Sequence, residues 1–328
     1  MLLELKGGKP KIIVILGPTA SGKSALAVEI AKRFNGEIIS ADSRQVYQGL
    51  NIGSGKITKK ETQGIPHHLI DVVSPKKTFT VVQYQKLAKK TIGQILNRNK
   101  LPIICGGTGF YIDALIYNYQ LPKVPPQKHL RKKLDKKSPE ELFKILSQLD
   151  PERAQNIDPY NKRRLIRALE IVMTTGLPVP KLFANNSQKF AENSYDVLKI
   201  GIGKSGVKLK KLIDQRVGEW INRGLIQEVK NLHKNSLSWR RLNELGLEYR
   251  ITARYLQNLI SYEQMVEMLK KETWRYAKRQ MTWFSAGGGS SPEANAPREH
   301  ASGGKKDKEI HWIKTKKEAF SLVKNFIS

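Results

Sequence analysis

Two patterns of apolar and polar positions alternate in the first third of the chain. Short, continuous apolar runs at 12–16 and 101–105 have the length of buried strands, and the segment 37–41, with Ile38 and Ile39 at its centre, has the same length. The segments 25–31 and 80–99 instead repeat their apolar residues at the spacing of a helix that buries one face. Strands that alternate with helices in this way predict an α/β fold, with a mostly parallel sheet covered by helices on both faces.

The pattern becomes wholly helical after the proline-rich segment 121–126. Helix start signals at Ser138 and Asp150, each followed by proline and glutamate, support this change. The segment 195–202 predicts a strand that returns to the sheet, and 310–313 predicts a last strand before a terminal helix. The sequence therefore predicts three parts: the first part of a P-loop α/β core at 1–121, a helical insertion domain at 122–190, and the completion of the core at 191–328.

Residues 285–304 differ in composition from the rest of the chain. They are rich in glycine, serine and alanine and contain no large apolar side chain. Such a segment cannot bury enough apolar surface to offset the entropy lost when it becomes ordered. We therefore predict a flexible loop there.

The residues between the first strand and the first helix match a phosphate-binding motif. They read G-P-T-A-S-G-K-S, the spacing of a P-loop in its usual strand–loop–helix setting. Glycines let such a loop point backbone N–H groups at phosphate oxygens, Lys23 adds a positive charge, and the Ser24 hydroxyl suits Mg²⁺. The motif predicts a polyphosphate site, without saying which polyphosphate, at Gly17, Pro18, Thr19, Ala20, Ser21, Gly22, Lys23 and Ser24.

Two further features follow predicted strands, at the end where ligands bind in open parallel sheets. Asp42 follows the strand at 37–41, where its carboxylate suits a general base or an Mg²⁺ ligand; the alternative is a residue that only stabilises a turn. Thr108 lies in the G-G-T-G turn at 106–109, where its hydroxyl can serve a phosphate or a leaving oxygen; the alternative is a helix N-cap. Either feature alone is a weak signal.

Positive charge dominates the composition. The chain has 58 Lys and Arg against 29 Asp and Glu, a formal net charge of +29, which favours a polyanionic partner such as nucleic acid. Alternatively, the charge reflects an organism whose proteins are all rich in lysine, and then it does not indicate a partner. Arginine discriminates better, because it pairs with phosphate in a fixed geometry. One predicted helix carries Arg163, Arg164 and Arg167. These arginines either contact phosphate groups of a nucleic acid or form an ordinary solvated face. The segment 278–284 mixes basic and aromatic residues, as RNA-binding surfaces do.

The composition also excludes several classes of protein. The single cysteine, Cys105, rules out an internal disulfide and a cysteine-based zinc site, and we expect it in a buried strand. His67 and His68 have no third metal ligand nearby in the sequence, so we expect structural roles for them. No apolar run approaches the ~20 residues of a membrane span, and the N-terminal segment is too short for a signal peptide, so we expect a cytoplasmic protein.

Taken together, the motifs resemble those of one enzyme family. In order along residues 11–284, the chain is similar to the tRNA dimethylallyltransferases, also called isopentenyltransferases. The P-loop is generic, but the second and fourth of the matching stretches are specific to that family. The stretches are G-P-T-A-S-G-K-S at 17–24, I-S-A-D-S-R-Q-V-Y at 39–47, G-G-T-G-F-Y at 106–111, R-R-L-I-R-A-L-E at 163–170 and A-K-R-Q-M-T-W-F at 277–284.

The resemblance implies an activity and roles for individual residues. The family transfers the dimethylallyl group of dimethylallyl diphosphate to N6 of the adenine on the 3′ side of the anticodon. It implies that the P-loop holds the donor's diphosphate, with Mg²⁺ at Ser24. It also implies that Asp42 accepts the amine proton and that Thr108 and Arg216 assist the departing diphosphate. The residues implied to contact tRNA are Asp42, Ser43, Arg44, Gln45, Arg163, Arg164, Leu165, Ile166, Arg167, Lys278, Arg279 and Gln280.

The implied partners are tRNA and dimethylallyl diphosphate, without a membrane, and a monomer suffices. Two other functions fit the same motifs. A P-loop kinase of a small molecule or nucleoside would share the phosphate site, although no segment stands out as an adenine-binding one. An RNA-binding protein that uses its P-loop only as a switch would share the basic residues. Turnover of ATP without tRNA would favour the kinase, and a dispensable Asp42 would favour the switch.

Overall fold

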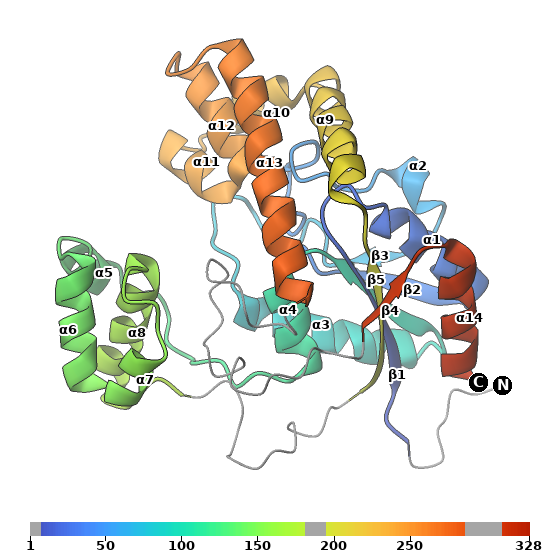
Figure 1. Ribbon diagram of the computed structural model, residues 1–328, viewed down its shortest axis with the longest axis horizontal. Helices are drawn as coiled ribbons and strands as arrows, with labels where there is room; N and C mark the ends of the chain where they lie inside the picture. The colour runs from blue at the N-terminus through green and yellow to red at the C-terminus, as the bar shows by residue number, and fades with distance from the viewer. Residues whose placement is uncertain (1–7, 181–194, 286–309) are drawn as a thin grey trace.

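The computed structural model describes residues 8–180, 195–285 and 310–328, and a parallel sheet lies at its centre (Figure 1). In the described part of the chain the sheet has six strands in the order β3-β2-β4-β1-β5-β6, and every neighbouring pair is parallel. The predicted α/β fold is therefore confirmed. The strands are β1 (Lys11–Leu16), β2 (Gly36–Ser40), β3 (His67–His68), β4 (Leu101–Gly106), β5 (Asp196–Ile202) and β6 (Ile310–Ile313).

Strand β3 is absent from the predicted pattern. It consists of His67 and His68, which pair in register with Ile38 and Ile39 of β2. Two half-buried residues carry no periodic signal, so this strand depends on its pairing with β2 rather than on local preference. His68 Nε2 also lies 2.7 Å from Glu37 Oε2, which agrees with a structural role.

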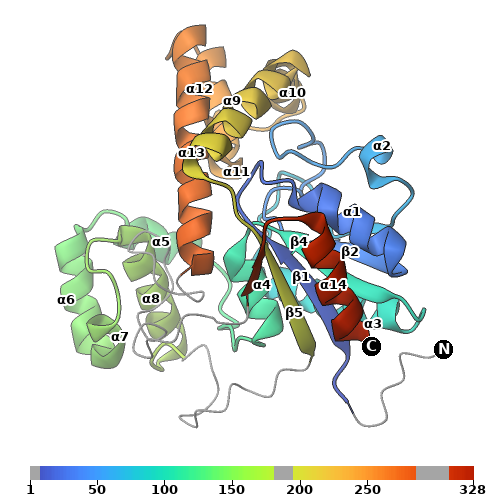
Figure 2. The same ribbon diagram turned by 45° about the vertical axis from the view of Figure 1, so that its right-hand side comes forward.

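Helices cover both faces of the sheet (Figures 1 and 2). Successive residues of β1 alternate between the two faces: Ile13 and Ile15 pack into one core, and Val14 packs into the other. Because both faces are covered, β1 is a continuous apolar run. Cys105 is buried in β4, as expected. The first face carries α1 (Lys23–Arg33) and α14 (Lys316–Ile327), the second carries α3 (Val81–Leu96) and α4 (Gly109–Ile116), and the short α2 (Lys59–Thr62) lies between β2 and β3.

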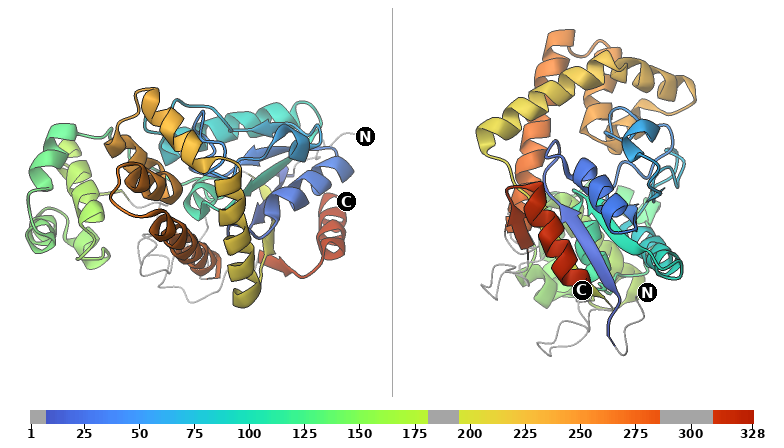
Figure 3. Two further views of the ribbon diagram at one scale, coloured as in Figure 1. Left: turned by 90° about the horizontal axis from the view of Figure 1, so that it is seen from above. Right: turned by 90° about the vertical axis from the view of Figure 1, so that its right-hand side faces the viewer.

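A group of helices with its own core forms one end of the molecule (Figures 1 and 3). Leu142 and Leu146 pack against Leu169 in this core. The predicted helix start at Ser138 is a complete capping box, in which side chains and backbone N–H groups satisfy one another. The group falls within the predicted insertion at 122–190, whose boundaries stay a prediction. Its helices are α5 (Lys128–Leu134), α6 (Pro139–Leu149), α7 (Pro151–Gln155) and α8 (Lys162–Thr175).

A buried carboxylate joins α5 to α8. Glu170 is fully buried and accepts hydrogen bonds from Arg131 Nε and Nη2, each at 2.7 Å, from Arg167 Nη1 at 2.5 Å and from the Gln127 N–H at 2.6 Å. Burial by itself would raise the pKa of Glu170, but these donors outweigh it and lower the pKa to about 2. The side chain of Arg167 also donates to the Val124 carbonyl oxygen at 3.1 Å. The same carboxylate therefore orders both helices and the segment before them.

Replacing Glu170 with glutamine should destabilise the protein at pH 7 by about 2 kcal/mol. Removing one partner of a fully buried ion pair costs ~3–5 kcal/mol. The cost here should be smaller, because Arg131 and Arg167 are partly exposed. The carboxylate stabilises the fold above its ordinary pKa of 4.5, and this contribution is lost as the pH falls through about 2. The difference in unfolding free energy between the two proteins should therefore shrink from pH 7 to pH 3. Urea unfolding at both pH values measures it, and equal differences would contradict the assignment.

The remaining helices form a second group that continues from the carboxyl end of β5 (Figure 1). The longest of them, α13, has 24 residues and runs from this group to α4, where Phe284 enters the core shared with α3. The predicted flexible loop 285–304 overlaps α13 at Ser285, which is helical, and its other residues lie outside the described part of the chain. No helix in the described ranges is long and apolar enough to span a bilayer. The helices of this group are α9 (Gly206–Asn222), α10 (Leu225–Lys234), α11 (Trp239–Leu245), α12 (Leu247–Leu256) and α13 (Tyr262–Ser285).

Candidate active site

The P-loop connects β1 to α1 at the edge of a large cavity. Gly22 takes a left-handed conformation, with φ of 91°, at the N-cap of α1. Lys23 follows it and donates from Nζ to the Pro18 carbonyl oxygen at 3.1 Å, so its ammonium lies across the loop. Burial lowers the pKa of Lys23, and nearby Arg216 acts in the same direction, while Asp42 acts against both. A cation beside a helix N-terminus favours an anionic ligand at this point.

The predicted P-loop residues do not all face the cavity. The backbone N–H of Thr19 is already used, because it donates to Gln280 Oε1 at 2.8 Å. The Ser24 side chain, in contrast, is exposed at the first turn of α1. The residues of the motif that line the cavity are Thr19, Ala20, Gly22, Lys23 and Ser24, whereas Gly17, Pro18 and Ser21 do not line it.

Asp42 lies just beyond β2 and also lines the cavity. Its Oδ1 accepts hydrogen bonds from the backbone N–H groups of Arg44 at 2.8 Å and Gln45 at 3.3 Å. The turn-stabilising role weighed for Asp42 is therefore real, but it occupies only one carboxylate oxygen. Within the described residues no protein group donates to Oδ2. Asp42 can thus hold its own loop and still accept a proton.

Thr108 ties this loop to the turn that follows β4. Its Oγ1 accepts a hydrogen bond from the Ser43 N–H at 3.1 Å. Thr108 occupies the N-cap position of α4, but its side chain makes no capping hydrogen bond, so the N-cap alternative does not describe its hydroxyl. Thr108 does not line the cavity, although Gly106 of the same turn does. The hydroxyl therefore contacts the loop of Asp42 rather than the cavity.

The cavity has a volume of about 1910 Å³ and connects three parts of the protein. Its wall is formed by the P-loop and Asp42, by α9, α11 and α12, and by α5 and α8. Sites for small molecules have volumes of ~300–1000 Å³, so this cavity has room for a larger ligand. Its walls carry many cations, among them Lys23, Arg44, Lys128, Arg163, Arg216 and Arg279.

Arg216 and Glu248 add opposite charges to the cavity wall. Burial lowers the pKa of Arg216, while Glu248 and Asp42 act to raise it. Burial raises the pKa of Glu248 to about 7, and Arg44 and Arg216 act in the opposite direction. The site therefore holds two carboxyl groups, Asp42 and Glu248, among several cations.

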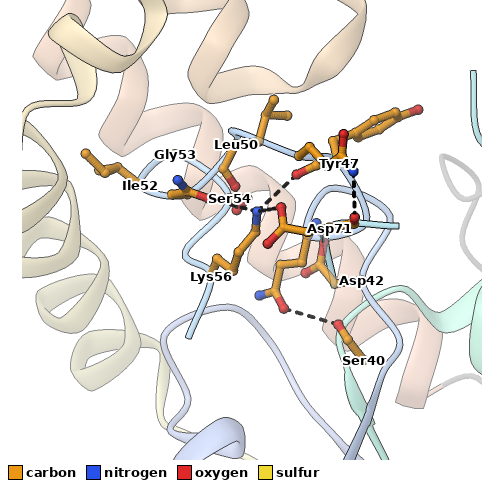
Figure 4. A network of polar contacts seen from close by, with 12 residues as sticks. Ser40, Asp42, Tyr47, Leu50, Ile52, Gly53, Ser54, Lys56 and Asp71 are labelled. Carbon is orange, nitrogen blue, oxygen red and sulfur yellow. Dashed lines mark hydrogen bonds and ion pairs between the residues drawn. The ribbon is translucent and has the colours of Figure 1, made fainter. Parts of the chain in front are cut away.

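Lys56 organises the loop that follows Asp42 (Figure 4). This lysine is 8% exposed, and its Nζ donates to the Tyr47 carbonyl oxygen at 3.0 Å, to Asn51 Oδ1 at 2.9 Å and to Asp71 Oδ1 at 2.6 Å. Three acceptors satisfy the three N–H groups of an ammonium, so Lys56 shapes the wall of the cavity rather than binding a ligand. Glu228 of α10 holds the same loop by accepting hydrogen bonds from three successive backbone N–H groups at 51–53.

A sequence model described as IPP transferase matches residues 45–287, well over half of the chain. The chain belongs to the IPP transferase family. A tRNA dimethylallyltransferase of Anoxybacillus flavithermus is 43% identical to it over 275 residues, which are 84% of this chain and 87% of the relative. The family inferred from the motifs is therefore confirmed.

Solved structures of related IPP transferases share the fold along almost the whole chain. A tRNA isopentenylpyrophosphate transferase of Staphylococcus epidermidis is 36% identical with a TM-score of 0.65, over 97% of this chain and 99% of that one. A eukaryotic dimethylallyltransferase acting on tRNA is 28% identical with a TM-score of 0.79, over 97% of this chain and 79% of that one. Each covers the P-loop core and both helical groups together.

The three arginines on α8 of this IPP transferase family member have different surroundings. Arg163 is exposed and lines the cavity. Arg167 also lines it but is bound to Glu170. Burial lowers the pKa of Arg164 to about 10, and this residue does not line the cavity. Between them, Leu165 is fully buried and Ile166 is 9% exposed at the cavity wall, so only part of the segment implied to contact tRNA faces open space.

Three consecutive residues of α13 also point in different directions. Arg279 and Gln280 line the main cavity, whereas Lys278 lines a separate, smaller one, with its Nζ 5.7 Å from the centre of the Trp274 ring. Residues two apart on a helix differ by about 200° in direction, so the sequence already argues against one surface for Lys278 and Gln280.

Two residues of the family member's site were not predicted. Lys56 had a sequence signal, because it stands in a polar, glycine-containing loop directly after Asp42. Glu248 had none, since nothing in the sequence places it near Asp42 or Arg216; packing of α12 against the other helices brings it there.

Proposed function

We propose that the protein transfers a dimethylallyl group from dimethylallyl diphosphate to N6 of the adenine on the 3′ side of the tRNA anticodon, with release of diphosphate. Its family and its tRNA dimethylallyltransferase relatives support this activity. The proposed donor site is the P-loop, and the proposed acceptor site is the cavity wall at Asp42.

One observation carries the proposal: the P-loop and Asp42 face a single cavity that extends to the basic side chains of α5 and α8. A small-molecule kinase needs only a compact acceptor pocket beside its phosphate site. A cavity of about 1910 Å³ instead suits one base of a large anion, with the rest of the anion outside. A target adenine inside a stacked RNA has to leave its stack to reach such a site.

The proposed reaction joins the allylic carbon of the donor to N6 of adenine as the bond from that carbon to the diphosphate oxygen breaks. The amine is a weak nucleophile, because its lone pair is delocalised into the ring, and it loses a proton during the transfer. Since the Arg44 and Gln45 N–H groups hold Oδ1 of Asp42, Oδ2 is the proposed proton acceptor. The departing diphosphate carries negative charge, which Lys23 and Arg216 are placed to offset.

A divalent metal suits this chemistry, and we propose Mg²⁺ at Ser24. In the part of the chain that the structure describes, no three His, Cys, Asp or Glu side chains gather around a point that could hold a metal ion. Mg²⁺ often takes one or two protein ligands together with substrate phosphates and waters, so the exposed Ser24 hydroxyl and the diphosphate fit it. When bound, the ion supplies further positive charge to the leaving group.

We further propose that tRNA lies along the cavity mouth, in contact with 42–45, Arg163 and Arg279. Because one chain supplies all of these residues, we propose a monomer. It would act in the cytoplasm, where tRNA is modified.

Replacing Arg163 with alanine should weaken tRNA binding and reduce the slope of log affinity against log salt by about one unit, because one phosphate contact is lost. Filter binding at several salt concentrations measures the slope. Lys90 on α3 is exposed and does not line the cavity, so K90A is the matched control and should leave the slope unchanged. An unchanged slope in R163A would show that this side of α8 contacts solvent rather than tRNA.

The proposed function is tested by mixing the protein with dimethylallyl diphosphate, Mg²⁺ and unmodified tRNA, then digesting the RNA for mass spectrometry. Prenylated adenosine is the expected product. ATP turnover without tRNA, and no prenylated product, would favour the kinase. Binding of tRNA without either reaction would favour the RNA-binding switch.

A further inference from the structure

Gln280 connects the two loops that surround the proposed diphosphate site. It lies near the end of α13 and is 6% exposed. Its Oε1 accepts a hydrogen bond from the Thr19 N–H at 2.8 Å, and its Nε2 donates to the Gly107 carbonyl oxygen at 2.9 Å. Since one partner is a donor and the other an acceptor, together they fix the orientation of the amide. The P-loop and the turn after β4 are thus joined through a residue 261 positions away from Thr19.

The glycines of the G-G-T-G turn allow α13 to pack closely against it. A Cβ atom added to Gly107 would lie 2.1 Å from Gln280 Nε2, and one added to Gly109 would lie 2.3 Å from Trp283 Cδ1. Both distances are far below any real contact, so the absence of a side chain at these positions is what lets the helix approach. The close approach of α13 therefore explains Gly107 and Gly109.

Further contacts fasten the same end of α13. Trp283 Nε1 donates to Asp113 Oδ2 of α4 at 2.8 Å, and Phe284 is buried in the core under the sheet. Farther along, α13 packs against α9, the helix that carries Arg216, and the two lie side by side in Figures 1 and 2. The helix that holds the P-loop therefore also supports the helix that bears the second cation of the site.

We propose that Gln280 is a positioning residue for the diphosphate of the donor. It sets the spacing between the P-loop and the turn of Thr108, and through α13 it keeps Lys23 aligned with Arg216. The proposal rests on the transfer reaction proposed above. It gives Gln280 a role different from the tRNA contact implied by the resemblance, because both ends of its amide are already bound to protein and its side chain is buried.

Replacing Gln280 with methionine tests the inference, because methionine fills a similar volume and makes neither hydrogen bond. We expect the affinity for dimethylallyl diphosphate, measured by calorimetry, to fall by roughly tenfold, as for the loss of buried hydrogen bonds. Turnover should fall by roughly 10- to 100-fold, because the diphosphate and the base are no longer aligned. Affinity for tRNA in filter binding should change by less than about twofold, because no tRNA contact is removed.

Gly107→Ala reaches the same contact from the other side, because its Cβ displaces Gln280 Nε2. Each single variant should lower diphosphate affinity to a similar extent, and the double variant should be no worse than either one. Thr282 is the matched control: it lies two residues farther along α13, is exposed, and bonds only the Lys278 carbonyl oxygen of its own helix. T282A should leave diphosphate affinity and turnover unchanged.

Three results would overturn the inference. The first is a loss of tRNA affinity in Q280M with normal diphosphate affinity, which would make Gln280 an RNA contact. The second is normal behaviour of Q280M in all assays. The third is additive losses in the double variant. If Q280M fails to fold, G107A alone provides the same readouts, because its Cβ disturbs the contact between Gly107 and Gln280 Nε2 without adding a charge. Calorimetry measures donor binding and does not need the prenyl-transfer reaction. If the protein without substitutions binds dimethylallyl diphosphate but does not prenylate tRNA, the proposed function is refuted and this test can still be carried out.

Discussion

Replacing Asp42 with asparagine should lower turnover by ~10²–10⁴-fold, the contribution expected of a well-placed general base. Asparagine has nearly the same shape, and its Oδ1 can still accept the hydrogen bonds that Arg44 and Gln45 now donate to Asp42. Its Nδ2 cannot accept a proton. The loop should therefore keep its structure while the proposed proton acceptor is lost, and the affinities for tRNA and donor should change by less than about twofold.

The alanine variant at the same position separates the two functions of Asp42. D42A removes the base and also the acceptor that holds the Arg44 and Gln45 N–H groups. It should lose turnover as D42N does and, in addition, bind tRNA more weakly, because 42–45 is a proposed contact. Single-turnover rates and filter binding on both variants give the comparison. If D42N loses affinity as strongly as it loses rate, or keeps its rate, Asp42 is not the base.

Replacing Lys23 with methionine should weaken the binding of dimethylallyl diphosphate by roughly 10- to 100-fold, because a hydrogen bond to a charged group contributes ~1.5–3 kcal/mol. The tRNA site should be unaffected. Lys32 stands on the same helix, is exposed, and bonds only Gln63, so K32M is the matched control. Calorimetry with the donor measures both, and equal losses in the two variants would remove Lys23 from the donor site.

The pH dependence of donor binding gives Lys23 a second signature. Burial lowers the pKa of its ammonium below the ordinary 10.5, so in the free protein it loses its proton at a lower pH than an exposed lysine does. Donor affinity should therefore decline with rising pH in the unmodified protein before the usual lysine range is reached. K23M should lack this part of the decline, and an identical pH profile in both proteins would contradict the assignment.

Much of the fold follows from local pattern. The strands β1, β2, β4, β5 and β6 were all predicted to within a residue or two. The clearest signals are those of β1 and β4, because a strand covered on both faces is a continuous apolar run. Several helices were predicted from apolar spacing and from start signals such as Ser138 followed by proline and glutamate. The two-residue β3 was missed, since its pairing partner rather than its own residues makes it a strand.

The candidate site divides in the same way. The P-loop, Asp42 and Thr108 were found because each immediately follows a strand, and parallel strands bring their carboxyl ends to one edge. The sequence did not show which of these groups already bind other parts of the protein. Arg167 is bound to Glu170, Lys278 faces away from the cavity, and the Thr19 N–H is bound to Gln280.

The parallel α/β fold, the phosphate motif, the family and the residues at the strand ends could all be predicted from the sequence, because they are properties of neighbouring residues. The three-dimensional packing is needed to see that Glu248 lies near Asp42 and Arg216, and that α13 reaches back to the P-loop through Gln280. Those facts depend on contacts between residues far apart in the chain. Such contacts are set by how helices pack on the sheet, and local periodicity does not record them.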